Sequence, residues 1–300
     1  MDWLQLAGQT LPSTTVRTML PLHVTTWDAP HARDDQVILI HGTMTWGLAA
    51  FAAQQPLAGH RRILVVDRRG FGASPDTEQS DYDVDADDIV GLMDRPTHLV
   101  GHSYGGVVAL LAAVRRPELL RSLALIEPSA LAVAADHPVV AAALRNNRRY
   151  VAAARSMSAE EYLLAAYGAD QPVPEPWEFA VRAAGTALRE RPCWEADLPV
   201  DALRSHDCPK LVLAGTWETA QPDYRSSVGE ALIVTAGIVA SRIGARLHRV
   251  SGADHAPHQQ RPEQVNRLLL QLWDEADIAA SARSGGGGQV PQTGGRRIDD

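Results

Sequence analysis

The segment best suited to chemistry is a serine flanked by glycines. Residues 101–105 read Gly-His-Ser-Tyr-Gly, which places Ser103 at the centre of a G-x-S-x-G pattern. A short apolar run, residues 98–100, precedes the pattern, and a run with helical spacing, residues 107–111, follows it. This order predicts a strand, a sharp turn and a helix, with the Ser103 hydroxyl on the turn at the positive end of the helix. The predicted chemistry is nucleophilic attack by Ser103 on a carbonyl carbon.

A serine nucleophile needs a base, and the eleven histidines of the chain are the candidates. A serine hydroxyl attacks poorly until a neighbour removes its proton, and a histidine, with its pKa near neutrality, suits that task. Two histidines, His255 and His258, follow the last strand-like run. His102 adjoins the nucleophile, but on a tight turn it is expected to point the other way and to serve in packing. The residues alone leave the base between His255 and His258.

Three further segments resemble motifs of the α/β-hydrolase superfamily. Residues 37–43 (VILIHGT) resemble its strand followed by His-Gly, residues 65–74 (VVDRRGFGAS) its D-x-R-G-x-G-x-S turn, and residues 252–258 (GADHAPH) its G-x-x-H segment. The resemblance covers roughly residues 35–130 and 208–275. It implies a serine hydrolase of the α/β-hydrolase fold, with a mostly parallel sheet flanked by helices.

The resemblance also implies roles for residues at the matching positions. His255 stands where the family has its catalytic base, which favours it over His258. The backbone N–H groups of Thr43 and Tyr104 correspond to the pair that holds an oxyanion. His41 is expected to pack in its loop, and the D-x-R-G-x-G-x-S turn to serve the architecture. This chemistry requires no metal and no cofactor, so neither is expected.

The carboxylate that would complete a Ser-His-acid triad has two main candidates. Glu127 ends the apolar run 123–126, so it is expected at the C-terminal edge of a buried strand, where some branches of the family place a glutamate. Glu218 follows the next core run, at the position that the family more commonly uses, although usually with aspartate. Because glutamate is longer by one methylene, the loop would have to retreat to fit Glu218. We favour Glu127, leave Glu218 open, and rank Asp223 and Asp254 lower.

Alternating strand-like and helix-like runs are expected to position these residues. Short runs of Val, Ile and Leu without polar alternation are typical of strands buried on both faces of a parallel sheet. They lie at residues 37–40, 63–66, 98–100, 123–126, 211–213 and 247–250. Helical spacing marks residues 84–93, 105–114 and 262–273. The alternation predicts an α/β fold with right-handed crossovers.

The alternation is interrupted in the middle of the chain. Residues 129–207 hold no good strand-like run, are rich in alanine with helical spacing, and are punctuated by prolines. We expect an inserted helical cap there, over the ligand crevice at the C-terminal edge of the sheet. The hydrolase core is expected to comprise residues 1–128 and 208–280. Residues 281–300 are a low-complexity, Gly-rich tail that is expected to be disordered.

Composition limits the class of protein and its partners. The 300 residues are 45% hydrophobic and 21% charged, which is typical of a globular chain, and the formal charge of −8 argues against a general nucleic-acid binder. Two cysteines, Cys193 and Cys208, are too few for a disulfide framework. The first residues lack a signal-peptide pattern, and no run reaches the ~18 apolar residues of a membrane helix. We expect a cytoplasmic bacterial protein that acts on a small molecule, and the oligomeric state stays open.

The predicted reaction is hydrolysis of a small-to-medium apolar ester or lactone through an acyl-enzyme. The expected cap offers aromatic side chains that fit an apolar pocket better than a peptide site; they are Tyr150, Tyr162, Tyr167, Trp177, Phe179 and Trp194. Most of them are expected in the core of the cap. C–C bond hydrolase, thioesterase and cofactor-free perhydrolase activities remain alternatives with the same triad. A ligand-binding protein that retains the triad is an alternative from another class.

Overall fold

A seven-stranded sheet forms the centre of the computed structural model, which describes residues 20–28, 33–168 and 172–285. The strands are β1 (Val24–Trp27), β2 (Gln36–Ile40), β3 (Arg62–Val66), β4 (Thr97–His102), β5 (Leu120–Ile126), β6 (Lys210–Gly215) and β7 (Arg246–Val250). Their order across the sheet is β1-β3-β2-β4-β5-β6-β7. The β1–β3 pair is antiparallel and all other pairs are parallel. The prediction of a mostly parallel sheet is confirmed.

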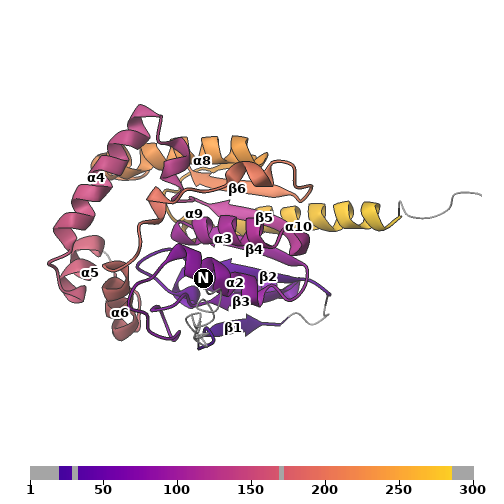
Figure 1. Cartoon of the computed structure of the whole chain (residues 1–300), viewed down its shortest axis with the longest axis horizontal. Coiled ribbons are helices and arrows are strands. Elements are labelled where there is room, and N and C mark those ends of the chain that lie inside the picture. The colour runs from indigo at the N-terminus through magenta and orange to yellow at the C-terminus, as the bar shows by residue number, and fades with distance from the viewer. Residues whose placement is uncertain (1–19, 29–32, 169–171, 286–300) are drawn as a thin grey trace, which may run out of the picture.

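Helices cover both faces of this sheet (Figure 1). The α-helices are α1 (Gly47–Phe51), α2 (Tyr82–Leu92), α3 (Tyr104–Arg115), α4 (Pro138–Ala154), α5 (Ala159–Tyr167), α6 (Trp177–Ala187), α7 (Pro222–Tyr224), α8 (Glu230–Ile243), α9 (Pro257–Gln260) and α10 (Pro262–Gly285). Short 3-10 segments lie at Ala52–Gly59, Pro117–Leu119, Leu131–Ala134, Cys193–Glu195 and Val200–Leu203, and a π-helical turn at Arg225–Gly229. The three helices predicted from the sequence correspond to α2, α3 and α10.

The core lies in two layers because successive residues of a strand point to opposite faces of the sheet. On one face, Ile38 and Ile40 of β2 join a buried cluster with residues of α2, α3 and α8. On the other face, Val37 and Leu39 join a cluster with residues of α1 and α10. Burial on both faces leaves no position for a solvated side chain, which is why β2 reads as a continuous apolar run.

All six strands predicted from apolar runs are present, each one to three residues longer than its run. The strand β1 was not predicted. Its sequence, Val-Thr-Thr-Trp, has no continuous apolar run, because it lies at the antiparallel edge of the sheet and none of its residues is fully buried.

The segment between β5 and β6 is helical, as expected for residues 129–207. Helices α4, α5 and α6 stand together beyond the ends of the strands (Figure 1). Within residues 129–168 and 172–207 the structure contains no strand. The helix α5 begins with a capping box, in which the side chains of Ser158 and Glu161 each accept from the backbone N–H of the other. The helical segment starts at the C-terminal end of β5, so these helices lie at the C-terminal edge of the sheet, where Ser103 is expected.

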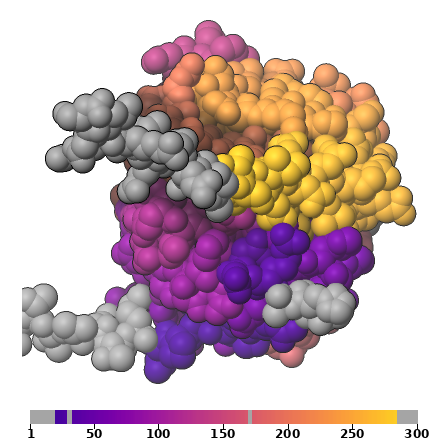
Figure 2. All heavy atoms as spheres, turned by 90° about the vertical axis from the view of Figure 1, so that its right-hand side faces the viewer, coloured from indigo at the N-terminus to yellow at the C-terminus, as the bar shows by residue number. Residues whose placement is uncertain are grey.

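The C-terminal helix is longer than the sequence predicted. The helix α10 continues to Gly285, so the first residues of the segment 281–300, predicted as a disordered tail, are helical. Residues 286–300 lie outside the described part of the chain. Figure 2 shows α10, in yellow, on the face of the molecule turned away from α4–α6.

One helical stretch of the described chain, Pro222–Ile243, has the length and apolar composition of a membrane span. Its inner residues Ala236, Val239 and Ile243 belong to the buried cluster on one face of the sheet. This packing accounts for the apolar composition as that of a core helix. The compartment of the protein stays a prediction.

We predict opposite effects for Gly→Ala changes at two glycines. A Cβ on Gly101 in β4 would lie 2.2 Å from the carbonyl oxygen of Gly105 in α3. Gly101→Ala is therefore expected to lower the free energy of unfolding by roughly 3 kcal/mol or more, or to prevent folding. A Cβ on Gly91 in α2 meets no atom within 4 Å, so Gly91→Ala should raise the free energy of unfolding by roughly 0.5–1 kcal/mol. Urea unfolding measures both, and a fully stable Gly101→Ala would contradict the described packing of β4 on α3.

Candidate active site

Ser103 lies on the sharp turn between β4 and α3. Its backbone has φ 54° and ψ −116°, a conformation that costs energy in any residue other than glycine. The N–H of Ser103 donates to the carbonyl of Ile126 on the neighbouring strand β5 (2.9 Å). Gly105 makes the turn possible, because a Cβ there would stand 2.2 Å from the carbonyl oxygen of Ile40 in β2. The local structure around the serine is therefore the strand, turn and helix that the sequence predicted.

His255 stands next to the serine. Its Nε2 lies 3.0 Å from the Oγ of Ser103, within hydrogen-bond distance. The carbonyl of His255 accepts from the Nε2–H of His102 (2.8 Å), which ties the loop after β7 to the turn that carries the serine. His258 is fully buried behind His102, with ring centroids 4.4 Å apart. Of the two candidate bases, the structure therefore brings His255 to the serine.

The two candidate acids lie in different surroundings. Glu127 is fully buried at the end of β5, and its Oε1 accepts from the backbone N–H of Gly215 (2.6 Å) and from the indole Nε1–H of Trp217 (3.1 Å). Glu218 is exposed, and its Oε1 accepts from the Oγ of Ser251 and from the next backbone N–H, each at 3.0 Å. Only Glu127 thus lies in the interior with the groups that surround Ser103.

Trp217 links the surroundings of Glu127 and His255. Its indole donates to Glu127, and its ring centroid lies 6.2 Å from that of the His255 imidazole. The Oε2 of Glu127 and the Nδ1 of His255 are both buried, and neither has a hydrogen-bond partner among the described residues. A buried polar atom without a partner is costly. In the described part of the chain no hydrogen bond joins these two side chains, and each has one polar atom without a partner near the indole of Trp217.

The loop after β2 and the start of α3 meet at the serine. Tyr104 is the first residue of α3, where backbone N–H groups have no acceptor within the helix. Thr43 follows β2 and lines the same pocket as Ser103 and Tyr104. Gly42 permits this approach, because a Cβ there would stand 3.1 Å from the Cβ of Ser103. The two residues expected to donate to an oxyanion are therefore both at the pocket.

His41 packs as the sequence analysis expected. Its Nε2 accepts from the backbone N–H of Arg68 (3.0 Å), so its Nδ1 carries the proton and donates to the carbonyl of Gly42 (2.7 Å). The carboxylate of Asp67 accepts from the backbone N–H of Gly47 (2.8 Å) and of Ala73 (3.0 Å). Both residues hold loops at the end of the strands, which is the architectural role predicted for this part of the sequence.

Backbone strain gathers at the same edge of the sheet. Among the described residues, the non-glycine residues with positive φ are Met44 (59°), Ser103 (54°), Glu127 (45°) and Trp217 (59°). They follow the C-terminal ends of β2, β4, β5 and β6. Such conformations cost of order 1–3 kcal/mol each and cluster where function requires them. This clustering is typical of a functional site and makes the edge around Ser103 the candidate.

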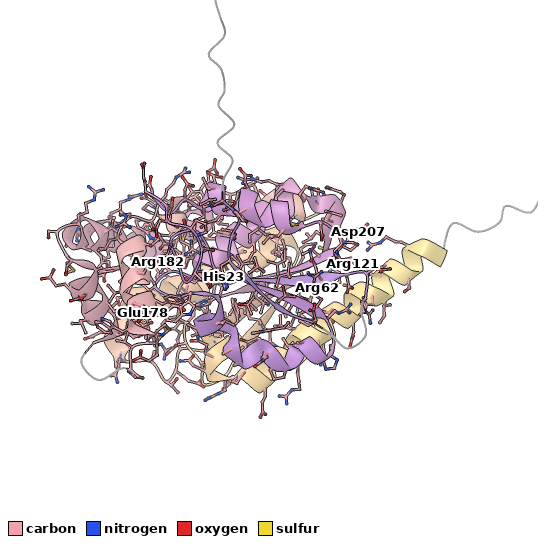
Figure 3. All side chains as sticks on the ribbon, turned by 90° about the horizontal axis from the view of Figure 1, so that it is seen from below. His23, Arg62, Arg121, Glu178, Arg182 and Asp207 are labelled. Carbon is pink, nitrogen blue, oxygen red and sulfur yellow. The ribbon has the colours of Figure 1, made fainter. Side chains whose placement is uncertain are left out.

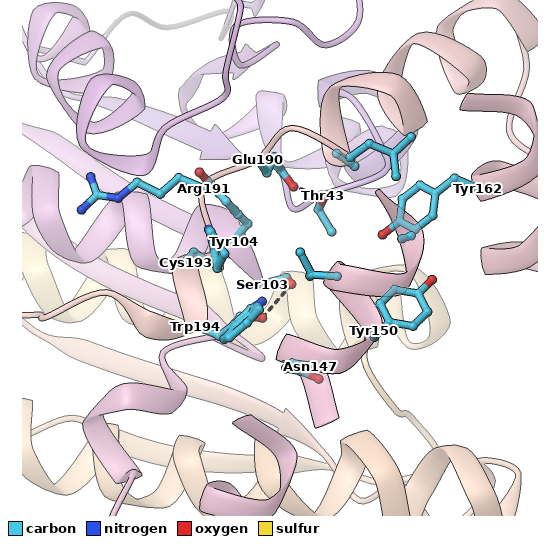
Figure 4. Close-up of a pocket in the computed structure, with 16 residues that line it drawn as sticks. Thr43, Ser103, Tyr104, Asn147, Tyr150, Tyr162, Glu190, Arg191, Cys193 and Trp194 are labelled. Carbon is cyan, nitrogen blue, oxygen red and sulfur yellow. Dashed lines mark hydrogen bonds between the residues drawn. The ribbon is translucent and has the colours of Figure 1, made fainter. Parts of the chain in front are cut away.

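A cavity of about 210 Å³ has Ser103 in its wall (Figure 4). Its other walls come from the loop after β2, from α4 and α5, and from the segment after α6. Three of the six aromatic residues singled out above line it: Tyr150, Tyr162 and Trp194. Tyr167 and Phe179 pack against a separate buried cluster, and Trp177 is 41% exposed. The expectation that most of the six form a cap core is thus met in part.

Two residues that the sequence did not reveal also reach the site. The Oγ of Ser129 lies 3.0 Å from that of Ser103. Glu190 lines the pocket, and its carboxylate accepts from the hydroxyl of Thr43. Ser129 carried a weak signal, since it follows Glu127 by two residues at the end of a predicted strand. Glu190 carried none, because its contacts are with residues far away in the sequence.

One group of possible metal ligands lies at the opposite edge of the sheet. Asp35 before β2, His98 in β4 and Asp277 in α10 bring ligand atoms within 4.8 Å of one another. The guanidinium of Arg61 bonds both carboxylates (2.5 and 2.6 Å). A guanidinium nitrogen of Arg121, which is labelled in Figure 3, lies 3.6 Å from the carboxylate of Asp277. Because arginine already supplies the positive charge, this cluster is best described as an ion-pair network that fastens α10 to the sheet.

The titration of the site follows from its burial. Removal from water raises the pKa of Glu127 to about 8, against the lowering effect of the hydrogen bonds from Gly215 and Trp217. Removal from water, and then the neighbouring His258, lower the pKa of His255 to about 4. The imidazole of His255 is therefore neutral at pH 7 and available to accept a proton.

Known proteins resemble this chain over most of its length in some cases and over about a third of it in others. Residues 37–268 match the family described as "Alpha/beta hydrolase family". The chain is 38% identical over 102 residues to a pimeloyl-[acyl-carrier protein] methyl ester esterase of Aeromonas salmonicida, covering 33% of this chain and 40% of that protein. It is 25% identical over 245 residues to the serine hydrolase BPHL of Mus musculus, covering 78% of this chain and 77% of that protein.

The solved structures include a thermophilic esterase from Thermogutta terrifontis with malate bound. Its TM-score is 0.61 at 24% identity, with 85% of this chain and 93% of that chain covered. At this identity the likeness establishes the fold alone. The match to the Aeromonas esterase spans about two fifths of that relative's length, so it does not extend that protein's activity to this chain.

We predict that Glu127→Gln and Glu218→Gln change stability in opposite directions. Glu127 titrates near 4.5 when unfolded and near 8 when folded, so between these values the unfolded chain has lost a proton that the folded chain keeps. Glu127 therefore destabilises the fold increasingly as the pH rises from about 4.5 to 8. The free energy of unfolding of Glu127→Gln should exceed that of wild type by up to a few kcal/mol at pH 9 and by much less at pH 5, since one pKa unit corresponds to about 1.4 kcal/mol.

Glu218→Gln is the matched comparison. The hydrogen bond from Ser251 and the backbone N–H of Gly252 lower the pKa of Glu218, so the fold favours its ionised form. This contribution is present above the unfolded pKa, and the variant should be slightly less stable than wild type at pH 9. Urea unfolding at pH 5 and pH 9 measures both variants. If wild type and Glu127→Gln were equally stable at pH 9, the buried position of the carboxyl would be wrong.

Proposed function

Because the chain belongs to the alpha/beta hydrolase family, we propose that it is a serine hydrolase that cleaves a small-to-medium apolar carboxylic ester or lactone through an acyl-enzyme. Its triad is Ser103, His255 and Glu127. The observation that carries the proposal is the 3.0 Å approach of His255 Nε2 to Ser103 Oγ at the wall of a pocket. An esterase and a serine hydrolase among the relatives support the class of reaction.

The reaction begins with proton transfer from the nucleophile. The neutral imidazole of His255 takes the hydroxyl proton on Nε2 while the Oγ of Ser103 bonds the carbonyl carbon. The imidazolium carries its other proton on Nδ1 and donates a hydrogen bond through it to the Oε2 of Glu127, which is buried and has no partner among the described residues. Glu127 takes this role rather than Glu218, whose carboxylate is exposed and bonded to Ser251. The ionised form of Glu127, which predominates above its pKa of about 8, stabilises the imidazolium and holds the ring in the productive tautomer.

Charge then develops on the former carbonyl oxygen. The backbone N–H groups of Thr43 and Tyr104 donate to this oxyanion, and the N-terminus of α3 adds a favourable field. When the intermediate collapses, His255 gives its proton to the leaving alcohol and the acyl group stays on Ser103. A water molecule, deprotonated by His255, next attacks the acyl carbon. The bond from that carbon to the Oγ of Ser103 then breaks, the acid leaves, and His255 returns the proton to the Oγ. Every proton and bond is accounted for by the chain, the ester and water.

The pocket limits the substrate. A volume of about 210 Å³, with Tyr150, Tyr162 and Trp194 in the walls, suits a small-to-medium apolar group. Arg191, the one arginine in the described lining, is already paired with Asp81 and Asp83, so it offers no free cation to an anionic substrate. We infer that α4–α6 form the cap that covers a neutral substrate and keeps bulk water from it.

Hydrolysis of p-nitrophenyl esters with short, medium and long acyl chains tests this proposal. Wild type should turn over, with kcat/KM highest for short to medium chains because of the pocket volume. Ser103→Ala and His255→Ala should each lose about 10⁴-fold or more in kcat, since nucleophile and base act as a unit. Glu127→Gln should lose about 10²- to 10⁴-fold, whereas the exposed Glu218→Gln should stay within about threefold of wild type.

The glutamate pair serves as an internal control, because both variants make the same chemical change. A larger loss in Glu218→Gln than in Glu127→Gln would move the acid to the loop after β6. Turnover that survives in Ser103→Ala would show that the esterase activity does not come from this serine, and the proposal would fall.

A further inference from the structure

Glu190 joins the segment after α6 to the loop after β2. Its Oε2 accepts from the hydroxyl of Thr43, and its Oε1 accepts from the guanidinium of Arg68 (2.6 Å). The side chain is 8% exposed and lines the pocket beside Thr43 (Figure 4). The triad and the proposed reaction steps make no use of this buried carboxylate.

Arg68 holds the same loop from inside the core. Its guanidinium is 1% exposed and donates to the carbonyl of Gly42 (3.0 Å) as well as to Glu190. It also lies over the ring of Tyr104, 4.1 Å from the centroid, and pairs with Asp85 (2.7 Å). Glu190 and Arg68 thus hold the loop by hydrogen bonds at two neighbouring residues, Thr43 and Gly42.

These hydrogen bonds restrain the peptide plane between Gly42 and Thr43. The carbonyl of Gly42 and the N–H of Thr43 belong to the same planar peptide unit, so holding the carbonyl fixes the direction of the N–H. Arg68 and the Nδ1–H of His41 both donate to that carbonyl, and Glu190 holds the side chain that follows. A loop that also contains the strained Met44 (φ 59°) needs such support to keep one conformation.

The segment that carries Glu190 is itself fastened to the core. On α6, Arg182 donates to the backbone carbonyl of Ser74 (2.6 Å; Arg182 is labelled in Figure 3). Directly after Glu190, the backbone N–H of Arg191 donates to the carbonyl of Ser80 (2.8 Å). By contrast, α4 and α5 contribute Tyr150 and Tyr162 to the pocket from the other side. Glu190 therefore reaches Thr43 from the anchored wall of the pocket.

We propose that Glu190 is a positioning residue: through the Thr43 hydroxyl and Arg68 it holds the Gly42–Thr43 peptide so that the Thr43 N–H points at the oxyanion. This inference rests on the proposed function, because it concerns one of the donors of that mechanism. Glu190 contacts neither the nucleophile Ser103 nor the base His255. Through Glu190, the position of the segment after α6 determines how well the Thr43 N–H is oriented toward the oxyanion.

The sign of the effect separates this role from a direct charge effect. A carboxylate near a developing oxyanion opposes it, so removal of the charge alone would raise kcat in Glu190→Gln. A positioning role predicts the reverse. The amide keeps a similar shape but lacks the charge that pairs with Arg68. If its one oxygen accepts from Arg68, its nitrogen can only donate to the Thr43 hydroxyl, so the ion pair weakens and the bond to Thr43 reverses. The N–H of Thr43 is then less well held.

The test compares Glu190→Gln, Thr43→Val and the double variant with wild type on a p-nitrophenyl ester. We expect each single variant to lose about 10- to 100-fold in kcat, somewhat less than complete loss of an oxyanion donor, with KM nearly unchanged. Because both changes act through the same Thr43–Glu190 contact, the double variant should be no slower than the slower single one. Thr43→Ser, which keeps the hydroxyl, should recover most of the loss of Thr43→Val.

Glu195→Gln is the matched control, since it makes the same change in an exposed residue that pairs with exposed Arg148 and does not line the pocket. It should keep the kcat of wild type. Thermal unfolding monitors the fold of each variant, and Thr43→Val tests the contact from an exposed position if Glu190→Gln proves unstable. Unchanged or raised kcat in Glu190→Gln, or additive losses in the double variant, would overturn the inference while Ser103-dependent turnover of wild type upholds the hydrolase. Absence of that turnover would overturn both.

Discussion

The site depends on a backbone-to-backbone contact that only glycine allows. Gly101 in β4 lies against Gly105 of α3, and Gly105 lies against Ile40 of β2, with room in neither place for a Cβ. This contact forces the chain to reverse within one residue, and Ser103 takes up the strained conformation that the reversal requires. The parallel sheet then places the ends of β2, β5, β6 and β7 beside that residue. The position of each group at the site follows from that one turn.

Buried charge is the second constraint, and the chain manages it in two ways. Arg68 pairs with two carboxylates and lies over two aromatic rings, so its charge is compensated. Glu127 has donors on one oxygen only, and burial raises its pKa to about 8. Such a cost to stability, with one oxygen left without a partner, is typical of a functional residue and is consistent with the role proposed for Glu127 as the triad acid. Under the proposed function, Glu127 is the triad acid, whereas Glu190 holds the loop that carries Thr43.

Sequence patterns predict the features that are encoded locally. The parallel strands are recognisable because burial on both faces requires continuous apolar runs, and the turn at Ser103 because its glycines lie within a few residues of the serine. The edge strand β1 escapes this logic, since its threonines face a half-solvated environment. The sequence favours Glu127 as the acid but leaves Glu218 open, because the choice depends on which loop brings donors to which carboxylate. Glu190 is the extreme case, since it meets Thr43 across 147 positions of sequence.

The measurement that tests the central claim most directly is labelling of the folded protein with a fluorophosphonate, followed by intact mass and peptide mapping. The probe reacts only with a serine whose hydroxyl proton is being taken by a base and whose oxyanion is stabilised. The account predicts a single adduct, located on Ser103, that forms far more slowly in His255→Ala and not at all after unfolding. A folded protein that gives no adduct on Ser103, or one that His255→Ala leaves equally reactive, would contradict the claim that His255 activates this serine.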